Sequence, residues 1–254
     1  MGAARLAMVV GLKTRHADGS AGDANYGLIG TGYTRYRQPD PHIASLIAKG
    51  LGDARTVLNV GAGAGSYEPL DRQVTAVEPS ESMRAQRPAH LPVALDAVAE
   101  RLPFADGSFD ASMATFTVHQ WSDLNVGLAE MRRVTRGPVL ILSCDPLALD
   151  RFWLHAYAPE AIAVEAGRYP PIAAIAAALG GRTETLQVPI PLDCTDGFGE
   201  AYYGRPERLL DPGARQANSA WSFVDPAVGE RFVAELTRDL DSGICASSRS
   251  STAR

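Results

Sequence analysis

The sequence predicts an α/β protein in which helices cover both faces of a mostly parallel sheet. Apolar strand-like segments alternate along the chain with segments whose apolar residues recur at helical spacing. Parallel strands need long crossover connections, so this alternation favours right-handed βαβ units. The 254 residues, 46% of them hydrophobic, are enough for the core of a single domain.

Charge and cysteine content narrow the class of protein further. The formal net charge of -5 argues against nucleic acid as a partner, because binding a phosphate backbone requires a basic surface. The three cysteines, Cys144, Cys194 and Cys245, are widely spaced and form no CxxC pair. They indicate neither a disulfide framework nor a zinc site, and we expect no metal and a cytoplasmic location.

The first half of the chain carries the clearest elements. Asp40 and Pro41 predict the start of a helix that ends near Gly52, and a second helix is expected over 124–134. The expected strands cover 55–60, 73–80, 91–95, 108–116 and 138–143.

The pattern loosens after residue 145. We expect helices over 150–166 and 170–180, a strand over 183–190, and short helices over 197–212. Asp225 and Pro226 predict the start of a final helix. Aromatic residues gather in this half, where they can form an apolar substrate pocket or simply a core.

These patterns divide the chain into segments. The expected division is a disordered leader (1–24), a lid (25–41), a cofactor-binding core (42–145), substrate-side elements with the last strands (146–242) and a disordered tail (243–254). The run "LAMVVGL" near the start is too short to span a bilayer, and no longer apolar run follows, so no membrane contact is expected.

The segment "LNVGAGAGSYEP" (58–69) follows the first expected strand and marks a ligand site. Gly61, Gly63 and Gly65 remove Cβ atoms where the backbone must turn tightly and approach a ligand. A dinucleotide fingerprint requires a third glycine where this chain has Ser66, and a triphosphate loop requires a lysine that is absent. The pattern therefore does not favour phosphate.

Two carboxylates follow at the ends of the next strands. Glu78 can accept hydrogen bonds from both hydroxyls of a ribose, although a solvated loop carboxylate is the alternative. Asp96 can accept the amino group of an adenine while the amide of Ala97 pairs with a ring nitrogen, or it can cap a helix. An adenosyl ligand without a pyrophosphate agrees with the expected roles of both carboxylates.

These residues carry a resemblance to the class I S-adenosylmethionine-dependent methyltransferases. "VLNVGAGAGSYEP" resembles the first motif of that family, "VTAVEPSESM" its second, and "ALDAVAERLPFADGSFDASMATFTVHQW" its third and fourth, in the same order and spacing. The likeness runs from about Tyr26 to Leu142. It implies a Rossmann-like seven-stranded sheet whose last strand is antiparallel, a helical substrate cap, and S-adenosyl-L-methionine as the cofactor.

The resemblance also implies roles for individual residues. Gly61, Ala62 and Gly63 would line the methionine part, with Thr115 beside it; Glu78 would hold the ribose; Pro79 and Met83 would face the adenine, and Asp96 and Ala97 its edge. The family often has an acid where this chain has Asn59, which can accept one hydrogen bond from the cofactor's ammonium but without charge.

The segment 25–41 and the end of the fourth strand complete the candidate site. The resemblance favours a lid that contains Tyr26, Tyr33 and Arg37, in which the arginine pairs with the cofactor carboxylate; the alternative is a surface loop. His119 in "TVHQW" is the candidate general base, and a structural histidine is the alternative.

Three functions agree with these patterns. The first is methyl transfer to an oxygen, nitrogen or carbon nucleophile of a small molecule, with secondary metabolism as its setting. The second is an adenosyl-cofactor-binding protein that does not methylate, and the third is an NAD(P)-dependent oxidoreductase, which Ser66 disfavours. Nothing in the sequence identifies the acceptor atom or an oligomeric state.

Overall fold

A four-stranded parallel sheet forms the centre of the structure, a computed structural model that describes residues 16–20, 22–29 and 32–243. Its strands are β1 (Thr56–Val60), β2 (Gln73–Val77), β3 (Ala111–Thr115) and β4 (Val139–Leu142), in the order β2-β1-β3-β4. The strand order reverses between β1 and β3. A reversal of this kind in a parallel sheet places ligands outside the carboxyl ends of the strands.

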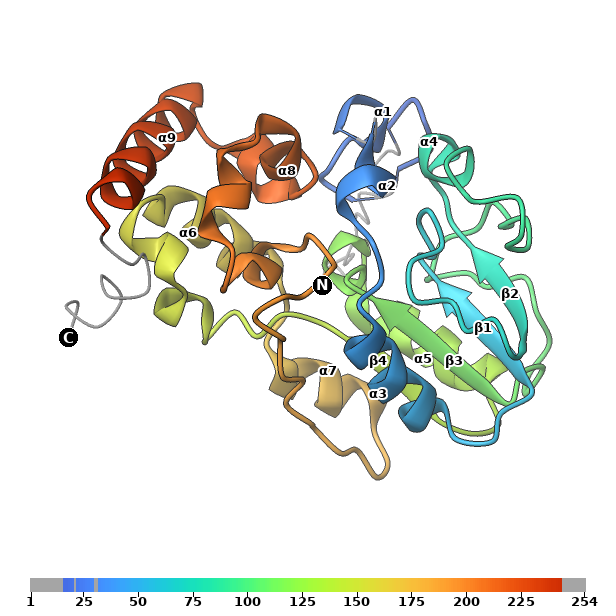
Figure 1. The fold of residues 1–254 in the computed structure, drawn as a ribbon. Coiled ribbons are helices and arrows are strands. Elements are labelled where there is room, and N and C mark those ends of the chain that lie inside the picture. Colours follow the sequence, from blue (N-terminus) through green and yellow to red (C-terminus); the bar gives the residue numbers. More distant parts are fainter. Residues whose placement is uncertain (1–15, 21, 30–31, 244–254) are drawn as a thin grey trace, which may run out of the picture.

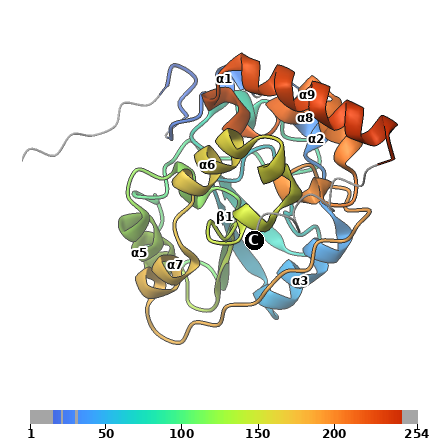
Figure 2. The same ribbon diagram turned by 90° about the vertical axis from the view of Figure 1, so that its left-hand side faces the viewer.

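Helices cover both faces of this sheet, as predicted. Figure 2 shows α3 (Pro41–Leu51) on one face, and α5 (Leu124–Val134) with α7 (Ile172–Leu179) on the other. The Asp40 carboxylate accepts hydrogen bonds from His42 and Ile43 and so caps α3 at its predicted start. The strands between these helices are apolar on both sides, which explains their continuous hydrophobic runs.

A helical cap with a core of its own lies beside the sheet. Figure 1 shows α6 (Pro159–Arg168), α8 (Pro212–Gln216) and α9 (Pro226–Asp241) grouped on the side away from β2. Short 3-10 helices join them: η2 (Leu149–Arg151), η3 (Trp153–Ala156), η4 (Gly199–Tyr202), η5 (Pro206–Leu210) and η6 (Ser219–Phe223). Trp153, Tyr157 and Phe232 form the centre of this second core. The predicted helical cap is therefore present.

Four further elements of the described chain are short. They are α1 (Tyr26–Ile29), α2 (Tyr33–Tyr36), α4 (Glu81–Arg84) and η1 (Val118–Gln120). In Figure 1, α1 lies beside α4 of the sheet domain, while α2 lies toward α8 of the cap. The Tyr36 hydroxyl donates to Asp211 at 2.9 Å, which attaches α2 to the cap.

The prediction of seven strands with an antiparallel last strand is wrong for the described part of the chain. In the segment 91–95, Leu95 alone pairs with β2, and Pro92 has no N–H to donate to a neighbouring strand. The segment 183–190 runs without sheet pairing, and Pro189 and Pro191 remove the donors that a strand there would need. Val188 and Ile190 instead pack onto the α3 side of the core.

The ends of the chain are described only in part. The predicted leader lies outside the described residues over 1–15, and so does the predicted tail over 244–254. Within 16–24 the described residues contact the domain: Asp18 accepts hydrogen bonds from Ser80 and Ser82, and Asp23 pairs with Arg168. None of the described helices is both long and apolar enough to cross a membrane.

Candidate cofactor-binding site

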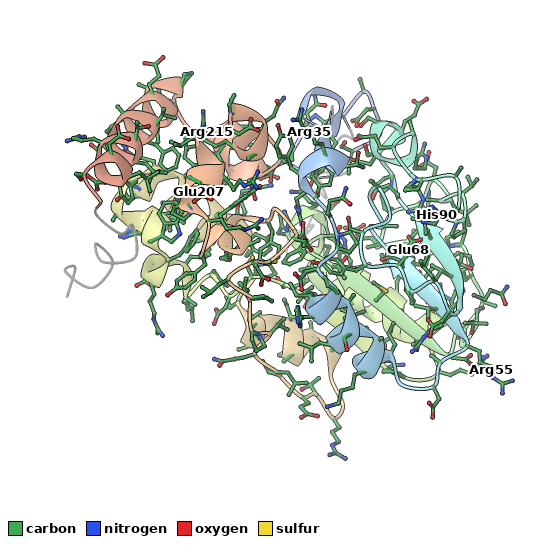
Figure 3. The ribbon with its side chains drawn as sticks, in the orientation of Figure 1. Arg35, Arg55, Glu68, His90, Glu207 and Arg215 are labelled. Atoms are coloured by element: carbon green, nitrogen blue, oxygen red, sulfur yellow. The ribbon has the colours of Figure 1, made fainter. Side chains whose placement is uncertain are left out.

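A pocket opens where β1, β2 and β3 end, under α1 and α2. It holds about 820 Å³ of empty space up to its open mouth, within the range of small-molecule sites. Figure 3 shows the two ends of the sheet: Arg55 points into solvent where β1 begins, whereas Glu68 lies among the loops where the strands end. The pocket belongs to the second end, as the strand order requires.

The glycine-rich loop forms the floor of the pocket. Gly61 has a φ of +68°, and its N–H, like that of Ala62, donates to the carbonyl of Val77 at 3.0 Å. A Cβ added to Gly61 would overlap the Thr117 side chain. Both observations require glycine at this position, and they leave bare backbone facing the pocket.

Glu78 lies at the end of β2 with its carboxylate held by backbone amides. The Gly63 N–H donates to Oε2 and the Ser80 N–H to Oε1, both at 2.8 Å. The side chain is 7% exposed, and burial raises the pKa of its carboxyl. Each oxygen retains a second lone pair, so the carboxylate can still accept hydrogen bonds from a ligand hydroxyl.

Arg37 joins the lid segment to the cap at the mouth of the pocket. Its Nε donates to Asp196 at 2.9 Å and its Nη1 donates to the Tyr33 hydroxyl at 2.8 Å. The guanidinium also lies over the rings of Tyr33 and Phe116, at 5.3 and 5.4 Å from their centres. Ring contacts and hydrogen bonds therefore orient Arg37 toward the pocket.

Comparison with known proteins agrees with this geometry. A family model described as "Methyltransferase domain" matches residues 58–141, which run from β1 into β4. Residues 58–141 therefore match a methyltransferase domain, in agreement with the resemblance that the sequence motifs carry. The cofactor of such a domain is S-adenosyl-L-methionine, which the sequence predicts.

Three individual relatives were also found, one solved structure and two curated proteins. A solved structure from Anabaena variabilis ATCC 29413, assigned to antibiotic biosynthesis as a methyltransferase, is 29% identical, with a TM-score of 0.75 over 82% of this chain and 89% of its own. A demethylmenaquinone methyltransferase from Beutenbergia cavernae is 41% identical over 101 residues, 37% of this chain and 41% of that protein. A malonyl-[acyl-carrier protein] O-methyltransferase from Erwinia pyrifoliae is 37% identical over 91 residues, 34% of this chain and 35% of its own.

The match with each curated relative spans 37% or less of this chain and less than half of that relative's own length. The Anabaena structure, in contrast, covers 82% of this chain and 89% of its own. Because the curated relatives match only part of this chain, the cap has to be understood from its own residues.

Most of the predicted site residues meet in the pocket of the methyltransferase domain. Those that line it are Tyr26, Tyr33, Arg37, Gly61, Ala62, Gly63, Glu78, Pro79, Met83, Ala97 and Thr115. Met83 is held on α4, where the Ser80 hydroxyl accepts its N–H. Segments up to 89 residues apart in the sequence are thus brought together at the carboxyl ends of three strands.

Three predicted site residues lie outside the lining of this pocket. Asn59 is fully buried in β1, where its Nδ2 donates to Glu68 at 3.0 Å and its Oδ1 has no hydrogen-bond partner among the described residues. Asp96 has a side chain that is 55% exposed and lies 3.8 Å from Arg84. No described helix begins after Asp96, so its alternative role as a helix cap is wrong.

His119, the third, lies on η1 behind the pocket wall. Its ring packs against Tyr169 of the cap with the centres 4.1 Å apart. Burial, with a smaller contribution from Arg168, lowers the pKa of His119 to about 3, so the imidazole is neutral at physiological pH. A neutral imidazole retains one nitrogen that can accept a proton.

Sequence reasoning missed Glu68 and Phe116. Glu68 is buried between Asn59 and Arg87, whose Nη2 donates to it at 2.8 Å, so an acid does lie beside the end of β1. Phe116 lines the pocket with a φ of +52°, which is rare for a bulky residue and is typical of strained functional sites. No local pattern marks either residue, because their contacts come from distant segments.

Proposed function

We propose that this protein transfers a methyl group from S-adenosylmethionine to an oxygen, nitrogen or carbon nucleophile of a small molecule. The observation that carries the proposal is the pocket itself, in which the bare backbone of Gly61 and the buried carboxylate of Glu78 share one strand-end site. The helical cap lies beside the sheet and would supply walls for an acceptor.

The roles proposed for the individual residues follow the parts of the cofactor. The Gly61–Gly63 backbone would hold the methionine portion, Glu78 the ribose hydroxyls, and Met83 with Pro79 the adenine face. The remaining predicted contacts are Ala97 and Asp96 at the adenine edge, Thr115 beside the sulfur, Asn59 beneath the ammonium, and Tyr26, Tyr33 and Arg37 from the lid. The buried Oδ1 of Asn59 lacks a hydrogen-bond partner among the described residues, which agrees with a ligand donor nearby.

The chemistry requires little of the protein beyond positioning. The bound cofactor supplies a methyl group on a sulfonium, whose sulfur leaves without help from an acid. The chain therefore has to exclude water and align the nucleophile with the methyl carbon. Tyr26 and Tyr33, with rings 6.3 Å apart in an edge-to-face arrangement, would close one side of the pocket. His119 remains the base that the sequence predicts.

The setting of the reaction is also a proposal. The Anabaena relative, which shares most of the length of this chain, is assigned to antibiotic biosynthesis, and this supports a role in secondary metabolism. The net charge of -5 supports a small acceptor rather than nucleic acid. We place the protein in the cytoplasm, in agreement with the free thiols of Cys144 and Cys194.

Two experiments test this function. Thermal unfolding with S-adenosylhomocysteine or NAD should show stabilisation by the first alone; stabilisation by NAD alone would support the oxidoreductase instead. Transfer of tritium from methyl-labelled cofactor to a panel of phenols, amines and carbon acids should label at least one compound. Cofactor binding without any labelling would favour the second alternative, a protein that binds the cofactor and does not methylate.

A further inference from the structure

Four polar side chains from the cap and from the end of β4 form a group, here called the cap-side cluster, in which Cys144 and Tyr169 are buried and the Glu165 side chain is 19% exposed. Its members are Cys144, Glu165, Tyr169 and Glu200. Glu165 comes from α6, Tyr169 follows α6, Glu200 lies on η4, and Cys144 follows β4 by two residues. The side chains of Glu200 and Tyr169 both interact with the Cys144 thiol, and burial together with the nearby carboxylates raises its pKa. Segments 56 residues apart thus place titratable groups in one interior position.

The cap-side cluster adjoins the cofactor pocket. Phe116, which lines the pocket, donates its N–H to Leu142 at 2.8 Å, and Cys144 follows Leu142 on the same strand end. Tyr169 packs against His119, whose neighbour Gln120 also lines the pocket. The cluster therefore lies at the end of β4, the strand next to β3, whose end contributes to the pocket.

Hydrogen-bonding capacity in this region is left unused. Glu165 Oε2 and His119 Nδ1 are both inaccessible to solvent and have no hydrogen-bond partner among the described residues. The nearest charged nitrogen to Glu165 Oε2, Nη1 of Arg168, is 3.6 Å away, too far for a hydrogen bond. Buried polar atoms are nearly always hydrogen-bonded, so the unpartnered acceptor on Glu165 agrees with a ligand donor beside it.

The charges around the cap-side cluster are not balanced. Arg37 is already paired with Asp196, and Arg168 makes two hydrogen bonds of 2.8 Å to Asp23. Arg168 is also 3.6 Å from Glu165, so these two arginines face four carboxylates, and two negative charges of the group are in excess. Burial, together with repulsion by Glu200, raises the pKa of Glu165 to about 7, and burial also raises the pKa of Glu200.

A cation would relieve this imbalance. Burying a carboxylate is costly unless an opposite charge and hydrogen bonds accompany it. An ammonium carries one positive charge and up to three donors, which is what two surplus carboxylates lack. The packed rings of Tyr169 and His119 belong to this region and can contact the apolar body of a ligand.

We propose, resting on the methyl transfer proposed above, that Glu165 and Glu200 bind the amino group of the methyl acceptor, so that the substrate is a small amine with an apolar or aromatic body. The Glu165 carboxylate takes a proton from the bound ammonium and leaves a neutral amine. The amine nitrogen forms a bond to the methyl carbon while the carbon–sulfur bond breaks and its electron pair stays on sulfur. The product leaves as a methylated ammonium, and the proton on Glu165 passes to solvent.

The test uses the full chain saturated with S-adenosylhomocysteine and a panel of aryl and alkyl amines. Each amine is matched with the alcohol and the carboxylate of the same skeleton, for example phenethylamine, 2-phenylethanol and 3-phenylpropanoate. Calorimetry should give at least tenfold tighter binding for an amine than for its matched alcohol. Both E165Q and E200Q should weaken amine binding at least tenfold and leave the affinity for S-adenosylhomocysteine unchanged.

Glu160→Gln is the matched control, because Glu160 lies on the same helix α6 but is exposed and pairs with Arg231. It should bind amine and S-adenosylhomocysteine as the wild type does. Preference for the alcohol or carboxylate members, or wild-type amine binding by E165Q and E200Q, overturns the proposal, as does a panel in which no amine binds. In each of these cases S-adenosylhomocysteine still binds and labelling of other acceptors can still occur, so methyl transfer is judged separately.

Melting of the ligand-free protein gives a readout that does not depend on any acceptor. If Glu165 and Glu200 are surplus acids kept for a ligand, neutralising either one should raise the melting temperature. If Glu165 served only to pair with Arg168, E165Q should lower it, and that result would also overturn the proposal.

Discussion

Arg37 and Asp196, 159 residues apart, form a buried ion pair in which Nε and Oδ1 are 2.9 Å apart. The Arg37 side chain is 9% exposed and that of Asp196 is 1% exposed. Asp196 also accepts the Tyr67 hydroxyl at 2.8 Å and the Gly197 N–H at 2.7 Å. One carboxylate thus ties together the lid segment, the glycine-rich loop and the segment that leads into the cap.

Replacing Asp196 by Asn should therefore destabilise the protein by about 3 kcal/mol, since it leaves the buried charge of Arg37 without its partner. Chemical denaturation of wild type and D196N measures this difference. The exposed pair of Glu160 and Arg231 is the comparison, and E160Q should cost less than about 1 kcal/mol. Equal losses of unfolding free energy in D196N and E160Q would show that the buried pair of Arg37 and Asp196 stabilises the protein no more than an exposed pair does.

Gly61→Ala should weaken cofactor binding at least tenfold and destabilise the fold only slightly. Gly61 and Gly52 have positive φ values, +68° and +57°, so alanine strains the backbone at either site by about 1 kcal/mol. At Gly61 the new methyl group also overlaps Thr117, whereas nothing lies within 4 Å of Gly52. Calorimetry with S-adenosylhomocysteine should show at least a tenfold loss for G61A and none for G52A. A similar loss in both variants would contradict a specific role for the Gly61 loop.

Glu78→Gln should weaken binding of S-adenosylhomocysteine by about tenfold. The two carboxylate oxygens accept from Gly63 and Ser80, and an amide would place its own N–H₂ against one of these donors. Glu81→Gln on α4 is the control, because that side chain is exposed. Unchanged affinity in E78Q would mean that the carboxylate stabilises the loop without contacting the ligand.

Local signals explain the parts of the structure that the sequence predicts correctly. Asp40 and Pro41 start α3, and Asp225 and Pro226 start α9, because a side-chain cap and a fixed φ act within one turn. The glycines and Glu78 sit at strand ends that hydrophobic runs predict. The strand predicted at 183–190 is wrong for a local reason. Alternating apolar residues favour a strand there, but Pro189 within the segment and Pro191 just after it leave too few N–H donors for pairing.

Long-range contacts explain what the sequence could not show. Glu68 becomes buried through Asn59 and Arg87, and Glu165 is brought to the end of β4 by the packing of the cap. The sequence predicts His119 as a base because it follows the strand that is β3 in the structure. The packing of Tyr169 from the cap against the His119 ring has no signal in the local sequence. Contacts of this kind depend on tertiary packing rather than on local residue patterns.

His119→Gln separates two candidates for the proton acceptor. If Glu165 takes the proton, H119Q should keep cofactor affinity and turnover within about threefold, while E165Q should lower turnover at least a hundredfold, within the usual contribution of a general base. Single-turnover tritium transfer to an acceptor that the wild type labels measures both. The reverse order of effects would assign the base to His119, as the sequence predicts.

The pH dependence of stability should reveal Glu165 directly. Its pKa is about 7 in the folded protein and 4.5 in an ordinary environment, so between these values the native state binds more protons than the unfolded state. Protonation of Glu165 therefore stabilises the wild type fully below pH 4.5, and this contribution is lost as the pH rises through 7. The charged groups that act on Glu165 are Glu200, Arg168, Arg37 and Asp23.

Denaturant titrations of wild type and E165Q from pH 5 to 8 measure this effect. The stability of E165Q relative to wild type should increase with pH and level off above pH 7, at a difference on the order of 3 kcal/mol. His119 does not obscure the trend, because its low pKa reduces stability only as the pH falls below its ordinary value of 6.5, in both proteins alike. A stability difference that is flat, or that decreases with pH, would mean that Glu165 is ionised and stabilised by its neighbours in the folded protein. The excess negative charge on which the amine proposal depends would then not exist.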